Sequence, residues 1–126
     1  MQIERLDHLV LTVTDIAATA DFYGKVLGMK TVTFAGNRKA LVFSSGKINL
    51  HAAGKEFEPM ALLPTPGSAD LCFITNTPVP AVVEHLRTHS IPIIAGPVKR
   101  KGAFGALLSI YFRDPDGNLI EVSNEE

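Results

Sequence analysis

A turn-forming stretch near the end of the chain, Asp114-Pro115-Asp116-Gly117-Asn118, constrains the fold more strongly than any other feature. A proline fixes the backbone angle φ near the value that turns require, and a glycine accepts positive φ. Asp and Asn side chains also hydrogen-bond to the backbone of such turns. Apolar-rich runs flank the stretch on both sides. The sequence therefore predicts a β-hairpin made of residues 107–113 and 118–123.

Glu121 is the unusual residue of the second strand of this hairpin. Side chains alternate across a strand, so Ile120 and Val122 point to one face and Glu121 points to the other. A carboxylate in the middle of a strand is costly unless it faces water, a cation or a metal ion. Glu121 is therefore a candidate metal ligand, and also a candidate catalytic group that moves a proton.

The rest of the chain repeats one order of elements. Alternating runs predict strands, and apolar residues at helical spacing predict two helices, the first preceded by Thr14 or Asp15 as a cap and ended by Gly28. The predicted strands cover residues 6–13, 29–34, 39–43, 48–52, 69–75, 91–94, 107–113 and 118–123, and the predicted helices cover residues 16–27 and 78–90. This order is β-α-β-β-β, written twice, which indicates two copies of one supersecondary unit.

The predicted fold class is α+β, with two βαβββ modules whose curved mixed sheets form a concave cup. A stretch rich in proline and glycine separates the modules. Module one covers about residues 1–53, the linker about 54–68, and module two about 69–126, together forming one domain. Each sheet has a helix on one face, and its opposite face is left to surround a ligand.

Composition narrows the classes of function. The 126 residues suit one domain, and a formal net charge of −1 gives no support for nucleic-acid binding. No apolar run is long enough to span a membrane, and the N-terminus lacks a signal-peptide pattern. The single cysteine, Cys72, excludes an internal disulfide and fits a reducing compartment. We therefore expect a cytoplasmic protein.

Strand parity gathers polar residues on the helix-free faces. In each strand the more apolar set defines the helix side, and the alternate residues point the other way. The residues assigned to the helix-free faces are His8, Asn49, His51, Asp70 and Glu121. Imidazole nitrogens and carboxylate oxygens together suit a divalent transition metal.

Three motifs carry a family resemblance. They are Leu6-Asp-His-Leu-Val-Leu-Thr-Val13, Asp21-Phe-Tyr-Gly-Lys-Val-Leu-Gly-Met29 and Arg113-Asp-Pro-Asp-Gly-Asn-Leu-Ile-Glu-Val122. In this order they resemble the vicinal oxygen chelate superfamily, which includes glyoxalase I, bleomycin-resistance proteins and extradiol dioxygenases. The segments Asn49-Leu-His51, Gly54-Lys-Glu-Phe-Glu-Pro59, Pro66-Gly-Ser68 and Ser109-Ile-Tyr-Phe-Arg-Asp-Pro-Asp116 look most like the glyoxalase domain-containing protein 5 group.

The resemblance implies paired βαβββ modules, a homodimer and one divalent metal ion (Zn, Ni, Mn, Co or Fe). His8 matches the first-strand ligand of the family, and Glu121 matches its last-strand carboxylate. Asp70 stands where the family often has a histidine, and the end of module one offers Asn49 and His51 where the family often has Glu or Gln. On this basis we expect His8, His51 and Glu121 to bind the metal, with Asp70 as a fourth ligand or a neighbouring catalytic residue.

The implied activity is metal-dependent chemistry on a small substrate chelated through vicinal oxygens, of lyase, isomerase or dioxygenase type. Asn49, Tyr111 and Arg113 are candidate substrate-binding residues, although Tyr111 also suits core packing and Arg113 also suits a surface pair with Asp116 or Glu121. One alternative is a metal-free protein that binds and sequesters a small molecule, as bleomycin-resistance proteins do. Another is a dimeric scaffold without a ligand.

Three further features have plain structural interpretations. His85 and His89 have the i, i+4 spacing of some zinc sites, but a solvated helix face explains them better. The basic cluster Lys99-Arg100-Lys101 is expected in a solvated loop, with attraction of an anionic substrate as the second possibility. Cys72 is expected to be chemically inert.

Overall fold

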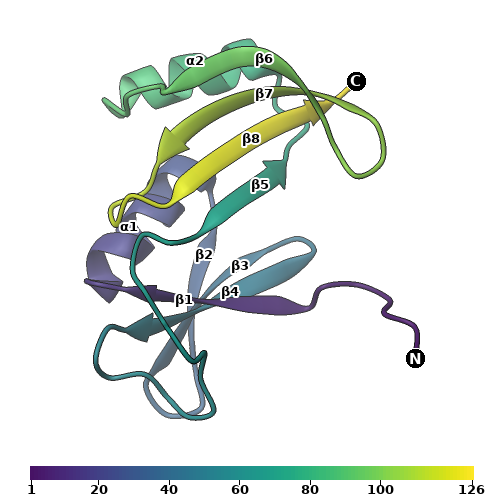
Figure 1. The fold of residues 1–126 in the computed structure, drawn as a ribbon. Helices are drawn as coiled ribbons and strands as arrows, with labels where there is room; N and C mark the ends of the chain where they lie inside the picture. Colours follow the sequence, from purple (N-terminus) through teal and green to yellow (C-terminus); the bar gives the residue numbers. More distant parts are fainter. The chain divides into compact units, whose positions relative to one another are not determined.

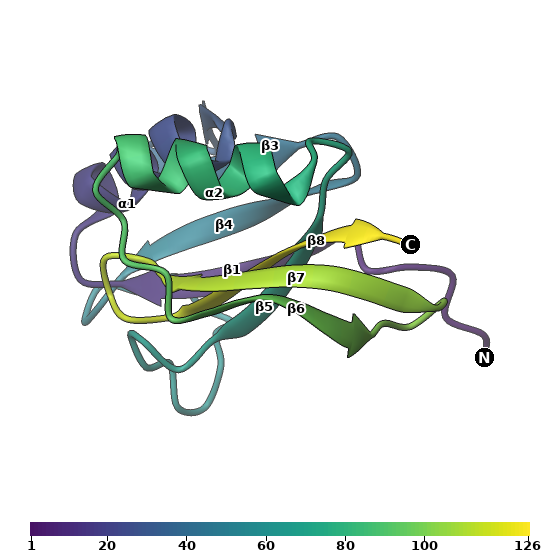
Figure 2. The same ribbon diagram turned by 90° about the horizontal axis from the view of Figure 1, so that it is seen from above.

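The chain folds into two units with the same order of elements. The computed structural model describes residues 1–126, which divide into the units Met1–Pro66 and Gly67–Glu126. In each unit a strand, a helix and three further strands follow one another (Figures 1 and 2). The elements of the first unit are β1 (His8–Val13), α1 (Ile16–Leu27), β2 (Lys30–Phe34), β3 (Arg38–Phe43) and β4 (Gly46–Ala52), and those of the second are β5 (Asp70–Ile74), α2 (Val79–Thr88), β6 (Ala95–Lys101), β7 (Ala106–Arg113) and β8 (Leu119–Glu125).

Each unit contains one mixed four-stranded sheet. In the first sheet the strand order is β1-β4-β3-β2, where β1 and β4 are parallel and the other pairs are antiparallel. In the second sheet the order is β5-β8-β7-β6, with the same pattern of directions. The predicted α+β class, with two βαβββ modules, is confirmed.

Local sequence signals position the first helix. The Asp15 carboxylate accepts a hydrogen bond from the backbone N–H of Ala18 and thereby caps the N-terminus of α1. Gly28 ends the helix with φ of 70°, a left-handed conformation that glycine adopts without steric cost. α1 contacts β2, β3 and β4 and covers its own sheet.

Alternation gives each sheet one buried apolar face. In the first unit, Leu11, Leu41, Ile48 and Leu50 are almost completely buried. In the second unit the corresponding residues are Ile110, Phe112, Ile120 and Val122, and α2 contributes Val79, Val82 and Leu86. We call the opposite face of each sheet its open face. The open face of the second sheet carries the polar residues of β7 and β8, as the position of Glu121 predicted.

The hairpin turn forms as predicted and also ties down the start of the second unit. One carboxylate oxygen of Asp114 accepts the backbone N–H groups of Asp116 and Asn118, and the other accepts the Asn118 side-chain amide. The side-chain oxygen of Asn118, Oδ1, accepts the backbone N–H of Ala69 over 2.8 Å. Asn118 is 1% exposed, so the turn and the entry to β5 share one buried polar residue.

The prediction of a strand at 91–94 was wrong. The strand is β6, Ala95–Lys101, so Lys99-Arg100-Lys101 lies in a strand and not in a loop. β6 is an edge strand and most of its residues are exposed, so it shows no apolar alternation in the sequence. Gly96, with φ of 98°, allows the backbone to pass close to the Ser109 carbonyl at the irregular start of the β6–β7 pairing.

Neither helix combines the length and the apolar character needed to cross a membrane.

Candidate functional site

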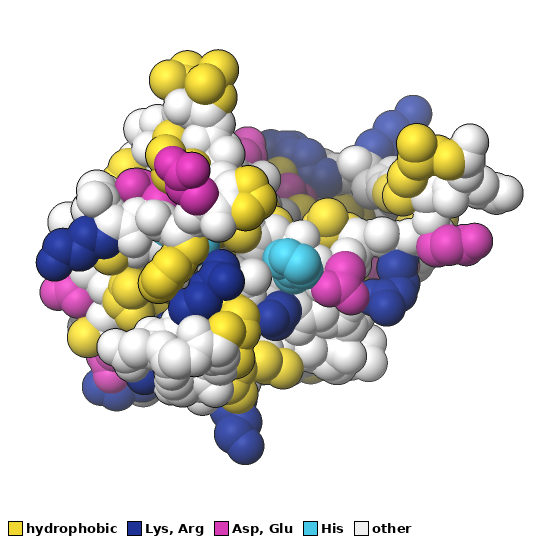
Figure 3. Space-filling view, turned by 90° about the horizontal axis from the view of Figure 1, so that it is seen from below, with side chains coloured by type: hydrophobic (Ala, Val, Ile, Leu, Met, Phe, Trp, Pro, Cys, Tyr) yellow, Lys and Arg dark blue, Asp and Glu magenta, His cyan; other side chains and the backbone are white.

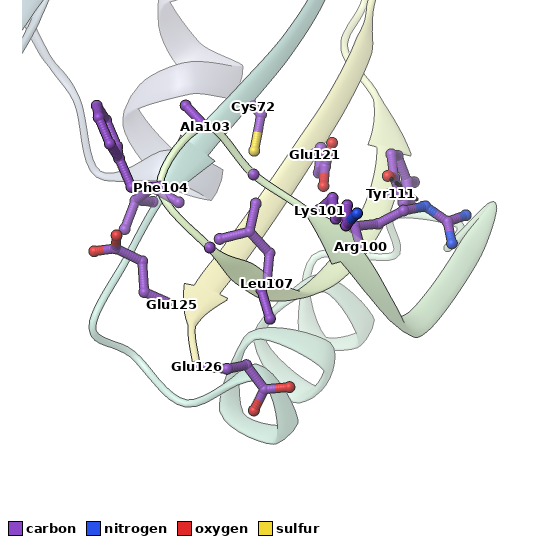
Figure 4. A pocket seen from close by; sticks show the side chains of 14 residues that line it. Cys72, Arg100, Lys101, Ala103, Phe104, Leu107, Tyr111, Glu121, Glu125 and Glu126 are labelled. Carbon is purple, nitrogen blue, oxygen red and sulfur yellow. Dashed lines mark hydrogen bonds between the residues drawn. The ribbon is translucent and has the colours of Figure 1, made fainter.

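A pocket of about 430 Å³ lies on the open face of the second sheet (Figure 4). All the residues around it belong to the second unit. They are Cys72, Ile74, Arg100, Lys101, Gly102, Ala103, Phe104, Gly105, Ala106, Leu107, Tyr111, Glu121, Glu125 and Glu126. The loop between β6 and β7, with the fully exposed Phe104, forms one side of it. The pocket is thus a hollow with apolar walls and a few acidic and basic groups.

Three strands place a row of reactive groups in this pocket. Glu121 of β8 is paired in register with Cys72 of β5 on one side and with Tyr111 of β7 on the other. Residues paired in register point to the same face of a sheet, so all three side chains face the pocket. Figure 4 shows Glu121 between Cys72 and Tyr111.

Two buried serine hydroxyls lie against the Glu121 carboxylate, and the Ser109 hydroxyl donates to it. Ser109 donates to Glu121 Oε2 over 2.6 Å, and the Ser123 hydroxyl lies 3.2 Å from the same oxygen. Both serines are completely buried. The Ser109 hydroxyl therefore orients the Glu121 carboxylate through Oε2.

The distances assign a directed chain of hydrogen bonds that ends on Glu121. Ser109 gives its only hydroxyl hydrogen to Glu121, so it accepts from the Ser123 hydroxyl, which is 2.7 Å away. Ser123 in turn accepts from the Cys72 thiol over 3.5 Å. Burial raises the pKa of the Cys72 thiol above its ordinary value, which keeps it protonated as a donor.

The sequence interpretation missed both serines. They occupy positions 109 and 123, which share strand parity with Tyr111 and Glu121, and this parity was the available signal. Serine in a strand usually decorates a surface, and nothing in the sequence indicates that these two are buried.

Tyr111 and Arg100 form the other end of the row. Arg100 Nε donates to the Tyr111 hydroxyl over 3.1 Å, and the guanidinium carbon lies 5.5 Å from the centre of the Tyr111 ring. Burial is the main cause that raises the pKa of the Tyr111 phenol, with the Arg100 hydrogen bond opposing it and the Glu121 charge adding to it. Since arginine only donates, the Tyr111 oxygen accepts here, and its own proton can be donated to the neighbouring Glu121 carboxylate.

Two other predicted residues of this unit lie outside that hydrogen-bonded row. Asp70 is exposed at the start of β5. The Arg113 guanidinium donates to the Gly117 carbonyl of the hairpin turn over 3.2 Å. The catalytic role of Asp70 and the substrate-binding role of Arg113 stay predictions.

In the first unit, His8 has surroundings that suit a metal ligand. Its Nδ1 lies 2.9 Å from the Asp7 carboxylate, and the side chain is about half exposed. The hydrogen bond from His8 is the main cause that lowers the pKa of Asp7. A carboxylate that fixes Nδ1–H leaves the Nε2 lone pair for a metal, as in many metal sites of proteins.

His51 has different surroundings. It is 3% exposed, and its Nε2 lies 3.5 Å from the Arg38 guanidinium. Burial and, after it, the Arg38 charge lower the pKa of His51. The imidazole is therefore neutral, but the cation beside its free nitrogen opposes a second positive charge there. These surroundings do not favour His51 as a metal ligand.

His8 and His51 are also separated along their strands. β1 and β4 pair with His8 opposite Lys47 and with His51 opposite Thr12, so four residues separate the two histidines along the ladder. At about 3.3 Å per residue this is roughly 13 Å between backbone positions. Asn49, the other predicted polar residue of β4, is 6% exposed and its side-chain oxygen has no hydrogen-bond partner.

No group of three or more His, Cys, Asp or Glu side chains is arranged to hold a metal ion. The residues that fit a metal best are Glu121, whose carboxylate is oriented by Ser109, and His8, whose Nδ1 is fixed by Asp7. Whether the predicted ligands share one coordination sphere stays a prediction.

Comparison with known proteins shows what this chain resembles. Residues 5–122 match the family model described as Glyoxalase/Bleomycin resistance protein/Dioxygenase superfamily. The chain is 61% identical over 123 residues to Virulence protein STM3117 of Salmonella typhimurium, covering 98% of this chain and 85% of that protein. The crystal structure of the Salmonella protein matches with a TM-score of 0.98 over the full length of both chains, at 60% identity.

A fungal relative and a more distant structure extend the comparison. Glyoxalase domain-containing protein RDO1 of Mycosarcoma maydis is 55% identical over 124 residues, covering 98% of this chain and 70% of that protein. The fosfomycin resistance protein FosX of Listeria monocytogenes, crystallised as an E126Q mutant with Mn(II) and a dihydroxypropylphosphonic acid, shares the fold, with a TM-score of 0.70 and 20% identity over 99% of this chain and 93% of that one. The chain therefore belongs to the glyoxalase/bleomycin resistance protein/dioxygenase superfamily.

Proposed function

We propose that the protein is a divalent-metal-dependent enzyme that moves a proton on a small substrate chelated through vicinal oxygens. The observation that carries this proposal is the Glu121 carboxylate, which faces a pocket and is fixed through one oxygen by Ser109. Hydrogen bonds of this kind orient carboxylates that bind metals. FosX, a protein of the same fold, was crystallised with Mn(II), which is consistent with a metal on this fold.

In this proposal Glu121 and His8 are protein ligands of the metal, and His51 is not required. When bound, the metal would act as a Lewis acid that polarises a substrate oxygen. The Glu121 carboxylate, oriented through Oε2, can bind a cation, and it can accept a proton if it is displaced from that cation. The role of Asp70 as a further ligand or proton carrier remains part of the proposal.

Tyr111 supplies a second proton-carrying group. Its raised pKa keeps the phenol protonated at neutral pH, and Arg100 holds its oxygen, so its proton can be donated to a substrate oxygen in the pocket. A carboxylate that accepts and a phenol that donates stand side by side on β8 and β7. This pair favours lyase or isomerase chemistry, in which a proton is taken from one atom and given to another.

Metal uptake tests the proposal. Protein dialysed against a chelator and then titrated with Zn, Ni, Mn, Co or Fe should bind one divalent ion per site, and Glu121→Gln and His8→Ala should each lose most of that affinity. His85→Ala removes an exposed histidine of α2 and serves as the control. If the dialysed protein binds no divalent ion stoichiometrically, the proposal is wrong.

Substrates from three reaction classes then test the chemistry. The loaded enzyme should be assayed with the methylglyoxal–glutathione adduct, fosfomycin and catechols. If the wild type converts the methylglyoxal–glutathione adduct and Glu121→Gln does not, the result would support proton transfer by Glu121. Oxygen consumption with catechols would contradict proton transfer as the reaction.

A metal-free binding protein is the second candidate, favoured by the absence of any group of three potential ligands. In that case the pocket would bind a small molecule and Glu121 would only line it. This alternative predicts that a small molecule raises the melting temperature of the metal-free protein and is not converted by it.

A further inference from the structure

Two histidines at the end of α2 form a pair that the proposed function does not use. His85 lies in the last turn of the helix, and His89 is the residue that caps its C-terminus. The centres of the two imidazole rings are 4.5 Å apart, and the ring planes are inclined by 56°. The i, i+4 spacing by itself favoured a solvated helix face. The structure adds that the two rings lie against each other, as side chains at this spacing can.

The separation of the rings matches that of two ligands of one metal ion. An imidazole nitrogen binds a divalent transition metal at about 2.0 Å, which places the ion about 3.2 Å from the ring centre. Two imidazoles bound at a right angle therefore have their ring centres about 4.5 Å apart, and a right angle separates neighbouring ligands in the tetragonal geometry of Cu(II). The helix thus already holds the two rings at the distance that a shared Cu(II) ion requires.

A hydrogen bond determines which nitrogen of His89 can bind a metal. The Nδ1 atom lies 3.0 Å from the backbone carbonyl oxygen of His85. A carbonyl oxygen only accepts, so Nδ1 carries the hydrogen and Nε2 of the neutral ring carries the lone pair. Metal-binding histidines usually donate their second N–H in this way, to a backbone carbonyl or to a carboxylate.

The charges around the pair favour a bound cation. The last carbonyl groups of a helix carry a partial negative charge, and both histidines lie at this end of α2. Arg87 is the nearest cation in the sequence, and it pairs with Glu84 over 2.7 Å, so its own charge is largely compensated. His85 is exposed and His89 is half-buried, so an ion that keeps some of its water can reach both rings.

We propose that His85 and His89 form a surface binding site for Cu(II), with two imidazole nitrogens as neighbouring ligands and water at the remaining positions. Nitrogen ligands bind Cu(II) more tightly than the other divalent ions of the first transition series. The ion joins residues one helical turn apart and thereby stabilises the end of α2. Neither histidine lines the Glu121 pocket, so the inference does not depend on the proposed enzyme activity.

A signal from two nitrogens would identify this site. The chain has four histidines, and the other two, His8 and His51, are four residues apart along the β1–β4 ladder and do not form a pair. On the face of the molecule that Figure 3 shows, acidic and basic side chains are interspersed with hydrophobic ones. A surface of mixed charge attracts a cation only weakly. Copper bound to two imidazoles therefore reports the pair on α2.

Cu(II) alone is the probe that tests the proposal. With one equivalent of Cu(II), the electron paramagnetic resonance spectrum of the wild type should show coupling to two imidazole nitrogens. His85→Ala and His89→Ala should each lose this signal and weaken Cu(II) binding about tenfold or more, because the second imidazole of a pair binds intramolecularly. Cu(II) should also raise the melting temperature of the wild type more than that of either variant.

Two variants test the spacing and not merely the number of histidines. In the His89→Ala background, Ala81→His places a histidine on the exposed surface of α2, four residues before His85, and should restore the two-nitrogen signal. Arg87→His in the same background places a histidine two residues after His85. Side chains at that spacing do not face each other, so the signal should stay absent.

The two proposed metal sites can fail independently. His8→Ala and Glu121→Gln should keep the two-nitrogen Cu(II) signal, whereas His85→Ala removes only the site on α2 and leaves the ion that depends on Glu121 and His8. The inference is overturned if the wild type shows no two-nitrogen signal. It is also overturned if the double variant His85→Ala/His89→Ala binds Cu(II) as tightly as the wild type.

Discussion

Ser109 on β7 donates its hydroxyl hydrogen to Glu121 Oε2 on β8 over 2.6 Å, and both residues are held by the same antiparallel ladder. The bond joins a fully buried hydroxyl to a carboxylate at the pocket. Because the two strands are fixed by their backbone pairing, the carboxylate has one orientation before any ligand arrives. A pre-oriented group loses less entropy on binding than a mobile one.

Ser109→Ala should therefore weaken divalent-metal binding, if Glu121 is a ligand, by about 10- to 100-fold, as loss of an orienting partner usually does. A competition titration with a coloured chelator measures the affinity. Ser44→Ala, which removes an exposed serine of the first unit, should leave it unchanged. Equal metal affinity in Ser109→Ala and the wild type would show that the hydroxyl does not orient a ligand.

The stability of the protein should fall in mild acid because of His51. Its pKa in the folded protein is lower than the ordinary 6.5, mainly through burial and then through Arg38. In the unfolded chain His51 takes up a proton near its ordinary pKa, so the unfolded state binds more protons just below pH 6.5 and the free energy of unfolding decreases there. The stabilisation is complete above that pH and is lost as the pH falls towards the folded-state pKa.

Thermal unfolding between pH 8 and pH 5 measures this effect. His51→Gln should flatten the decrease below about pH 6.5, whereas His85→Gln on the exposed surface of α2 should not. If the stability of His51→Gln decreases with falling pH as steeply as that of the wild type, other groups cause the acid sensitivity.

Asn118→Ala should destabilise the second unit strongly. It removes the acceptor for the Ala69 N–H and the donor to Asp114, both in a buried setting. Each buried group left without a partner costs about 1–3 kcal/mol, so a loss of several kcal/mol in the free energy of unfolding is expected. Urea denaturation measures it, with Asn37→Ala at an exposed turn as the control. A loss no larger than that of the control would refute the role given to Asn118.

Asp15→Ala should have a smaller effect, confined to the start of α1. The carboxylate caps the helix through the Ala18 N–H, and loss of such a cap costs about 1 kcal/mol. Asp15→Ser keeps an oxygen at the cap and should recover most of the stability. If Ser and Ala at this position are equally destabilising in urea, the cap is not the source of the effect.

The outcome for β6 shows where sequence interpretation fails. Strands with one buried face were found by alternation, as for β8 with Ile120 and Val122 buried around Glu121. β6 buries neither face well and is held by backbone pairing with β7, so its side chains carry no periodic signal. As a result, Arg100 was expected in a loop, whereas it lies in a strand and reaches Tyr111.

The sequence by itself determined the repeated βαβββ order, the caps, the hairpin turn and the face to which Glu121 points, because these depend on alternation and on neighbours within a few residues. Only the tertiary structure decided that Ser109 holds Glu121 and that Arg38 stands against His51. Both contacts join side chains of different length that come from different strands. The Arg38 charge beside the His51 imidazole also changes what that imidazole can bind. Parity gives the direction of a side chain, but the identity of its neighbours comes from strand register.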